Sequence, residues 1–299
     1  MSFTLEIIDE LVAKEYEKTC CKKAFLFGLF FGAERLSKSE VRAEFKTEQS
    51  ARLAESILKK QFAAEPALES IVRAGRQMYW VTVNSKALSV YVDKLGREEN
   101  IGCDELEKMV GFRCEDCRKS FLAGVFVVSG LATDPKKRYS LEFCVKCEIR
   151  AAILSAFLCD TVGEPRCVDR RGRIGLYYRG NEKVCDILAY MGAFGAHFAV
   201  DDACVENELK NQENRATNCV MKNIEKSVAA TRRHIDAIER LKASGRFELM
   251  SDELKYTARL RCEYDAATLT ELALLHEPEI SKSGLNRRLE KIIDFSNEK

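Results

Sequence analysis

The stretch Cys21–Gly28 reads CKKAFLFG, and the stretch Cys117–Gly124 reads CRKSFLAG. The two stretches agree, by identity or close substitution, at seven of eight positions. Each continues as an apolar run and then reaches a small residue and a turn. Because such self-similarity is the signature of a duplicated structural unit, we expect two copies of one fold in this chain.

The segments that follow these stretches have the same order in both copies. A strand-like segment is followed by an Ala- and Leu-rich helical segment, a hairpin-like segment and a last helix. These are residues 41–45, 49–60, 78–83 and 86–94 in the first copy, and 139–143, 148–158, 174–178 and 181–190 in the second. The predicted fold class is α+β, with two tandem αββαββα repeats related by a pseudo-twofold axis.

Small residues mark the first helix of each copy. Ala24, Gly28 and Gly32 are four positions apart, as are Ser120 and Gly124, so each set forms one ridge on its helix. Such ridges let two helix backbones approach closely. Alternatively, these are ordinary core helices with incidental glycines, although glycine inside a helix costs about 1 kcal/mol and usually has a packing reason.

The runs Leu26–Glu34 and Leu122–Gly130 resemble the LAGLIDADG motif of homing endonucleases. In that family the eighth motif position is acidic, and two such acids hold divalent metals for phosphodiester cleavage. Here the eighth positions are Ala33 and Ser129, which supply no anionic oxygen. Glu34 lies one residue later, about 100° around the helix. The resemblance therefore implies the scaffold without its nuclease, and we expect no catalytic residue, no metal, no cofactor and no enzyme.

The segment Ser251–Lys299 is typical of a compact helical domain. Ser251 begins one helix, and Thr268 and Glu271 form a capping box at the start of the next. We expect that second helix to bury Leu269, Leu272 and Leu275. The run His276–Glu279 breaks it, and a third helix starts after Ser281. The predicted architecture is an all-α helix-turn-helix domain.

The third helix has the pattern of a DNA-recognition helix. Its apolar face carries Leu285, Leu289, Ile292 and Ile293, and short polar residues and cations occupy the rest. The predicted DNA-binding residues are Ser281, Lys282, Ser283, Gly284, Asn286, Arg287, Arg288 and Lys291. We expect Ser283, Asn286 and Arg287 to read base edges, and Lys282, Arg288 and Lys291 to hold phosphates. The alternative is a solvated helix face that happens to be basic.

The runs Ile280–Leu289 and Asn214–Cys219 resemble signatures of the WhiA family, and the resemblance extends along essentially the whole chain. It implies a transcriptional regulator, tied to sporulation or cell division, that joins a degenerate LAGLIDADG-like domain to a helix-turn-helix. Double-stranded DNA is the implied partner, with RNA polymerase or another regulator as a second candidate. A protein-interaction scaffold with secondary DNA contact, and an active nuclease that uses Glu34, are the alternatives.

Few helix breakers interrupt residues 205–241, where we expect one or two long helices. The predicted domains are repeat 1 (1–107), repeat 2 (108–203), a helical linker (204–247) and the helix-turn-helix (248–299). Within the linker, Asn214, Arg215 and Asn218 contact phosphate in one interpretation and cap against the repeat domain in the other.

The 13 cysteines are scattered and odd in number, which fits a reducing compartment better than a disulfide framework. Cys114, Cys117, Cys144 and Cys147 have the spacing of a zinc site. However, Cys117 is the repeat equivalent of Cys21, and Cys144 falls in a strand-like segment. Free buried thiols are therefore the preferred interpretation.

Composition limits the remaining classes of function. A net charge of +1 argues against a non-specific polyanion binder but permits a local basic face. The sequence shows no signal peptide, and its longest apolar run, Ala24–Ala33, is about half a membrane span. We expect a cytoplasmic, nucleoid-associated protein without a membrane partner.

Overall fold

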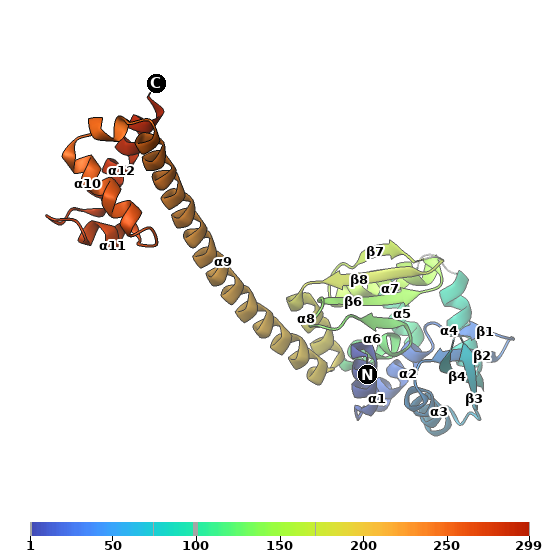
Figure 1. Cartoon of the computed structure of the whole chain (residues 1–299). Helices are drawn as coiled ribbons and strands as arrows, with labels where there is room; N and C mark the ends of the chain where they lie inside the picture. Colours follow the sequence, from blue (N-terminus) through green and yellow to red (C-terminus); the bar gives the residue numbers. More distant parts are fainter. Residues whose placement is uncertain (1, 74, 98–100, 171, 299) are drawn as a thin grey trace. The chain divides into compact units, whose positions relative to one another are not determined.

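The computed structural model describes residues 2–73, 75–97, 101–170 and 172–298. It divides into two compact units, Met1–Glu208 and Leu209–Lys299, which are described in turn. The first unit mixes helices and strands, whereas the second is helical (Figure 1). Among the described residues, no helix is both long enough and apolar enough to cross a membrane.

The first unit contains the two predicted αββαββα copies. Copy one comprises α2 (Thr19–Leu29), β1 (Glu34–Arg35), β2 (Glu40–Phe45), α3 (Glu48–Phe62), β3 (Ala67–Arg73), β4 (Arg76–Asn84) and α4 (Lys86–Arg97). Copy two comprises α6 (Asp116–Ser129), β5 (Gly130–Ala132), β6 (Ser140–Val145), α7 (Glu148–Thr161), β7 (Arg166–Asp169), β8 (Ile174–Arg179) and α8 (Asn181–Met191). The helices α1 (Phe3–Ala13) and α5 (Cys103–Val110), which the repeat did not predict, each precede a copy. The predicted fold class is confirmed.

Each copy forms an antiparallel four-stranded sheet, and the two sheets have equivalent strand orders, β1-β2-β4-β3 and β5-β6-β8-β7. Alternate residues of each central strand point into the core, as the two-residue period of a strand requires. In copy one, Val41 pairs with Val83 and Ala43 with Val81, and all four are buried. Helices cover this apolar face, so both copies contribute to one continuous core.

The two sheets meet through helices α2 and α6, whose backbones touch. A Cβ atom on Gly28 would lie 2.2 Å from the Phe121 carbonyl oxygen, and one on Gly124 would lie 2.2 Å from the Phe25 oxygen. The predicted close approach is therefore confirmed at these two glycines. Gly32 is not part of the ridge: α2 ends at Leu29, and a Cβ on Gly32 would meet nothing within 4 Å.

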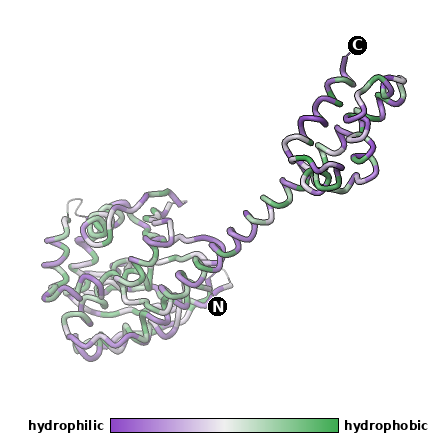
Figure 2. Tube along the Cα trace, turned by 90° about the vertical axis from the view of Figure 1, so that its left-hand side faces the viewer, coloured by the Kyte–Doolittle hydropathy of each residue, from purple (hydrophilic) through white to green (hydrophobic). Residues whose placement is uncertain are grey.

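The long helix α9 (Phe194–Ala243) starts in the first unit and ends in the second. The Glu10 carboxylate accepts the free amides of Gly195 and Ala196 at 2.7 and 3.0 Å, which satisfies donors of its first turn. Residues 208–229 are exposed, and hydrophobic and hydrophilic positions alternate along this stretch (Figure 2). One helix thus occupies the segment for which one or two were predicted.

The second unit packs the end of α9 against η1 (Arg246–Leu249), α10 (Asp252–Glu263), α11 (Leu269–Leu274) and α12 (Lys282–Asn297). The capping box of Thr268 and Glu271 is present at the start of α11. One predicted core residue is wrong: Leu275 is 41% exposed, and Ala273 is buried instead. The reason is that α11 ends at Leu274. Leu275 is therefore no longer on the helix whose buried side was predicted to contain it.

We expect Gly28→Ala and Gly124→Ala each to lower the free energy of unfolding of the first unit by about 3 kcal/mol, at the upper end of overpacking effects. The added methyl group meets backbone atoms, which cannot rotate away. Gly96→Ala is the matched control, because Gly96 lies in α4 and its Cβ would meet nothing within 4 Å. Urea unfolding followed by Trp80 fluorescence measures all three, and equal midpoints for all three would contradict the contact.

We expect the second unit to lose stability as the pH falls from about 6.5 towards 4, because His234 is buried uncharged. Burial first, and then Arg261 and Arg233, lower the pKa of His234 to about 4. The unfolded chain therefore takes up a proton that the folded chain does not. The loss attributable to His234 is at most about 3 kcal/mol.

Urea titrations of the full chain at about pH 7.5 and about pH 5, with limited proteolysis to assign the transitions, test this expectation. His234→Gln should reduce the acid sensitivity of the second unit. His197→Gln, which lies in the first unit, is the control. An unchanged pH dependence in His234→Gln would refute the assignment.

Candidate functional site

Helix α12 begins at Lys282 because the preceding residue caps it. The Ser281 hydroxyl accepts the Gly284 amide at 3.1 Å, and the hydroxyls of Ser281 and Ser283 are also 3.1 Å apart. A Cβ on Gly284 would lie 3.2 Å from the Ser281 hydroxyl, so the glycine leaves room for this cap. The first turn carries no acidic residue. Its positive dipole end is therefore available to an anion.

The two faces of α12 differ as predicted from the sequence. Leu285, Leu289 and Ile292 are fully buried in the core of the unit. Gly284, Arg288 and Ile293 are half-buried. The exposed members of the predicted DNA-binding set are Ser281, Lys282, Ser283, Asn286, Arg287 and Lys291. These short polar side chains, the Asn286 amide and the cations share one side of the helix with the exposed Glu290, and we call this surface the α12 face.

Arg288 differs from the other cations of this helix. Its guanidinium lies 3.3 Å from the Glu253 carboxylate on α10, and 26% of its side chain is exposed. The ion pair joins α12 to α10 and partly neutralises this end of the surface. To hold a phosphate, Arg288 would have to leave Glu253.

The turn before α12 is anchored by a residue that sequence reasoning did not single out. His276 is buried, and its Nε2 lies 3.2 Å from the Thr257 hydroxyl of α10. The Tyr256 ring packs edge-on against the same imidazole at 4.9 Å. The histidine stands in the break between two helices, so no periodic pattern could reveal that it is buried.

Beside the C-terminal ends of α2 and α6, each copy of the first unit places a lysine against a residue of the other copy. Lys46 of copy one donates to the Gly130 carbonyl of copy two at 2.6 Å. Lys146 of copy two lies 3.6 Å from the Glu34 carboxylate of copy one. Glu34 and Gly130 are equivalent positions of the two motifs, and each lysine follows the second strand of its copy. Each copy thus extends a lysine to the motif end of the other.

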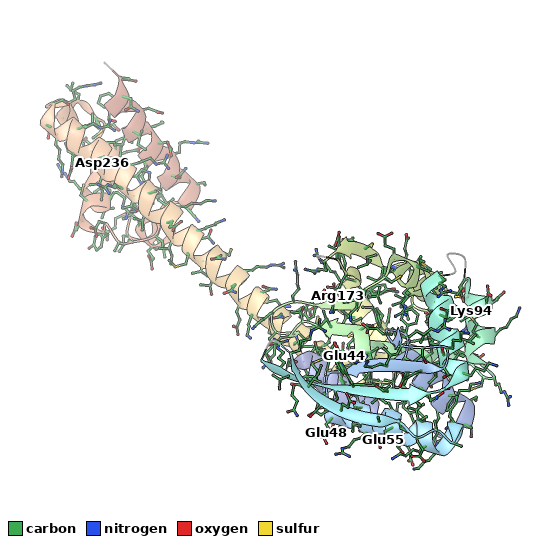
Figure 3. The ribbon with its side chains drawn as sticks, turned by 90° about the vertical axis from the view of Figure 1, so that its right-hand side faces the viewer. Glu44, Glu48, Glu55, Lys94, Arg173 and Asp236 are labelled. Carbon is green, nitrogen blue, oxygen red and sulfur yellow. The ribbon has the colours of Figure 1, made fainter. Side chains whose placement is uncertain are left out.

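Other basic groups complete this region. Arg150 donates to the Ala33 carbonyl at 2.9 Å, and burial lowers its pKa. Burial also lowers the pKa of Lys46 to about 8. Arg173 and Glu44, which Figure 3 labels, line one pocket together with Lys146 and Arg150. Metal-assisted cleavage needs paired carboxylates, but Ala33 and Ser129 stand at the motif positions. Four cations lie in this region, namely Lys46, Lys146, Arg150 and Arg173.

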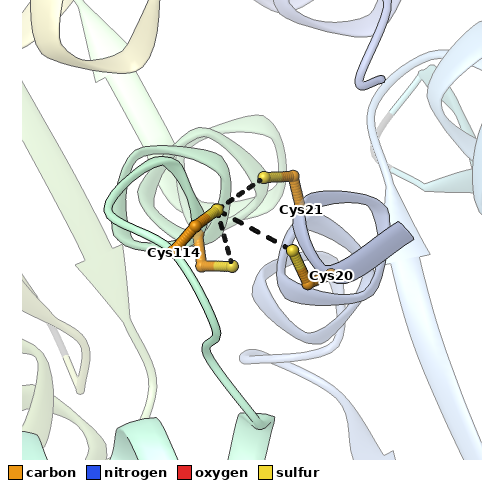
Figure 4. Close-up of side chains that lie close together, drawn as sticks. Cys20, Cys21 and Cys114 are labelled. Carbon is orange, nitrogen blue, oxygen red and sulfur yellow. Dashed lines mark hydrogen bonds between the residues drawn. The ribbon is translucent and has the colours of Figure 1, made fainter. Parts of the chain in front are cut away.

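The structure groups the cysteines differently from the CxxC…CxxC spacing of the sequence, which was the alternative to free buried thiols. Cys114 and Cys117 lie beside Cys20 and Cys21 (Figure 4). Cys144 lies within β6, and Cys147 precedes α7. Cys114 and Cys117 therefore have their cysteine neighbours in the other copy and not in Cys144 and Cys147.

The polar group of Asn214, Arg215 and Asn218 lies on α9, within its exposed stretch. All three side chains are exposed.

Comparison with known proteins places this architecture in a family. Residues 118–210 match the WhiA LAGLIDADG-like domain, and residues 214–296 match the WhiA C-terminal HTH domain. A probable cell division protein WhiA from Desulforudis audaxviator is 31% identical, covering 98% of this chain and 96% of its own length. One from Caldicellulosiruptor saccharolyticus is 29% identical over 100% of this chain and 95% of its own. Full-length DUF199/WhiA from Thermotoga maritima has the same fold, with a TM-score of 0.59 at 20% identity over 99% of this chain and 97% of that one. This chain belongs to the WhiA family.

Proposed function

We propose that this chain is a sequence-specific DNA-binding transcriptional regulator that reads DNA with the α12 face. The observation that carries the proposal is the division of α12 into a fully buried apolar side and an exposed polar and basic side. The N-terminus of α12 is capped by Ser281 and has no acidic residue in its first turn, so its positive dipole end favours binding of a phosphate. Since its relatives are named probable cell division proteins, we assign the regulated process to cell division, with sporulation as the alternative.

Within this proposal, each exposed group has a role that follows from its chemistry. Asn286 and Arg287 present the planar donor groups that pair with adenine and guanine edges, and Ser283 contacts either base. Lys282 and Lys291 hold phosphates as point charges. Ser281 and Gly284 let the backbone approach the groove. Arg288 contributes only after it separates from Glu253.

We propose that the first unit is a scaffold without nuclease activity. The cations at the ends of α2 and α6 support this role, because they occupy the surroundings where a nuclease needs carboxylates.

The proposed domain boundaries are those predicted from the sequence, at 107/108, 203/204 and 247/248. The proposed location is the cytoplasm, in association with the nucleoid, and RNA polymerase is a second proposed partner.

We expect Arg287→Ala to weaken binding to a selected duplex by about 1–3 kcal/mol and to blur the base preference at one position. Lys291→Ala should weaken binding to all sequences alike and reduce its salt dependence. Selection from genomic duplexes with the full chain, followed by titrations at two salt concentrations, measures both effects. Arg259→Ala, on the exposed side of α10, is the matched control.

If Arg287→Ala and Lys291→Ala both bind as the parent does, another surface reads the DNA. If the parent chain selects no sequence, the protein-scaffold alternative is favoured.

We expect the full chain to leave supercoiled plasmid intact in the presence of Mg²⁺ or Mn²⁺. The motif positions Ala33 and Ser129 supply no carboxylate to hold either ion. Gel electrophoresis after prolonged incubation measures this directly. Cleavage by the parent that disappears in Glu34→Gln would contradict the proposal and assign a nuclease activity to Glu34.

A further inference from the structure

Four cysteine sulfurs meet where helices α2 and α6 begin (Figure 4). Cys20 and Cys21 lie in the first turn of α2 and Cys117 lies in the first turn of α6, whereas Cys114 lies two residues before α6 begins. The Sγ atom of Cys114 lies 3.7 Å from that of Cys20, 3.5 Å from that of Cys21 and 3.6 Å from that of Cys117. All four sulfurs lie within 4.8 Å of one another.

These separations match the edges of a zinc–thiolate tetrahedron. With Zn–S bonds of about 2.3 Å, tetrahedral geometry places neighbouring sulfurs about 3.8 Å apart. A disulfide would require about 2.05 Å, which none of the three measured separations approaches. We propose that Cys20, Cys21, Cys114 and Cys117 bind one structural Zn²⁺ ion. This proposal replaces the expectation of no metal and does not depend on the proposed function.

The surroundings of the cluster suit thiolate ligands. The Arg113 amide donates to the Cys117 sulfur at 3.5 Å. Two helix N-termini meet here, and their unpaired amides favour negative charge. Lys18 lies at the same end, 3.0 Å from Asp116. Four thiolates around Zn²⁺ carry a net charge of −2, which the two helix N-termini partly offset.

The ligand set indicates a structural role for the metal. Four protein thiolates fill the tetrahedron, whereas catalytic zinc sites keep one position open for water or substrate. Two ligands come from copy one and two from copy two, so the ion would join the copies at the end of α2 and α6 opposite to Lys46 and Arg150. Cys114 is 93 and 94 positions from its partners in copy one, so the closed loop is long and its entropic stabilisation is large.

A second possible ligand group provides an internal control. Cys185, His197 and Asp201 also lie within ligand distance of one another, but they offer three donors that already interact among themselves. Cys144 and Cys147 provide another control, since they complete the zinc spacing in the sequence but lie outside the cluster. Substitutions at Cys185 and Cys144 therefore test whether zinc binds at the proposed site or at one of these two other groups.

The decisive experiment is the zinc content of the full chain, purified from zinc-supplemented cells without chelator. We expect about one Zn²⁺ per chain in the parent and in the controls Cys144→Ser and Cys185→Ser. Cys114→Ser should lose most of it, because Cys114 contacts all three other sulfurs. Retention of zinc by Cys114→Ser, its loss in either control, or a parent that neither contains nor takes up zinc would overturn the proposal.

A test without substitutions guards against a variant that fails to fold. The parent is stripped with a chelator under reducing conditions and titrated with Co²⁺ and then Zn²⁺. We expect the intense visible absorption and thiolate charge-transfer band of tetrahedral Co²⁺, followed by their loss on Zn²⁺ addition. Zn²⁺ should also protect Cys20, Cys21, Cys114 and Cys117 from alkylation, as read by peptide mass spectrometry. Protection of another set, or a disulfide among these four in the freshly purified chain, would refute the site.

Discussion

The direct contact between the backbones of α2 and α6 is the constraint on which the first unit depends. Gly28 and Gly124 face each other's helix so closely that a single methyl group on either would overlap a carbonyl oxygen. This approach fixes the distance between the two sheets and brings both ends of the helix pair together. The cysteine cluster lies at one end of the helix pair, and the contact of Lys46 with Gly130 lies at the other. Both require the close approach of the helices, because their members come from different copies.

The same contact does not depend on the motif positions that carry the acids in homing endonucleases. The contact is made by glycines within the helices, whereas the metals of a homing endonuclease would sit beyond the helix ends. Replacement of the acids by Ala33 and Ser129 leaves the crossing intact. The ends are then held by Lys46 and Arg150, which donate to carbonyls of the opposite copy. Packing and catalysis are thus separable in this fold.

The duplicated pattern was sufficient to predict the element order, because each copy repeats the same hydrophobic periods. Contacts between copies were harder to predict. Gly32 fits the four-residue spacing, but α2 ends at Leu29 and removes it from the ridge. The cysteines illustrate the same limit. Cys21 and Cys117 are repeat equivalents, and from the sequence alone this correspondence argues against a metal site. In a pseudo-twofold helix pair, however, equivalent residues near the crossing face each other, so the correspondence was the signal for the cluster.

The sequence was sufficient to predict which side of α12 is buried and which is exposed. It was not sufficient to predict the charge of the exposed side. Leu285, Leu289 and Ile292 define the buried side by spacing alone, whereas the pairing of Arg288 with Glu253 depends on how α10 packs. About three exposed cations remain on this helix, so its counterion release would give a log–log salt slope of only about −3. Electrostatics of that size produces weak non-specific binding. Under the proposed function, selective occupancy of a DNA site therefore needs base contacts, for which the proposed residues are Asn286 and Arg287, or a second surface of the chain.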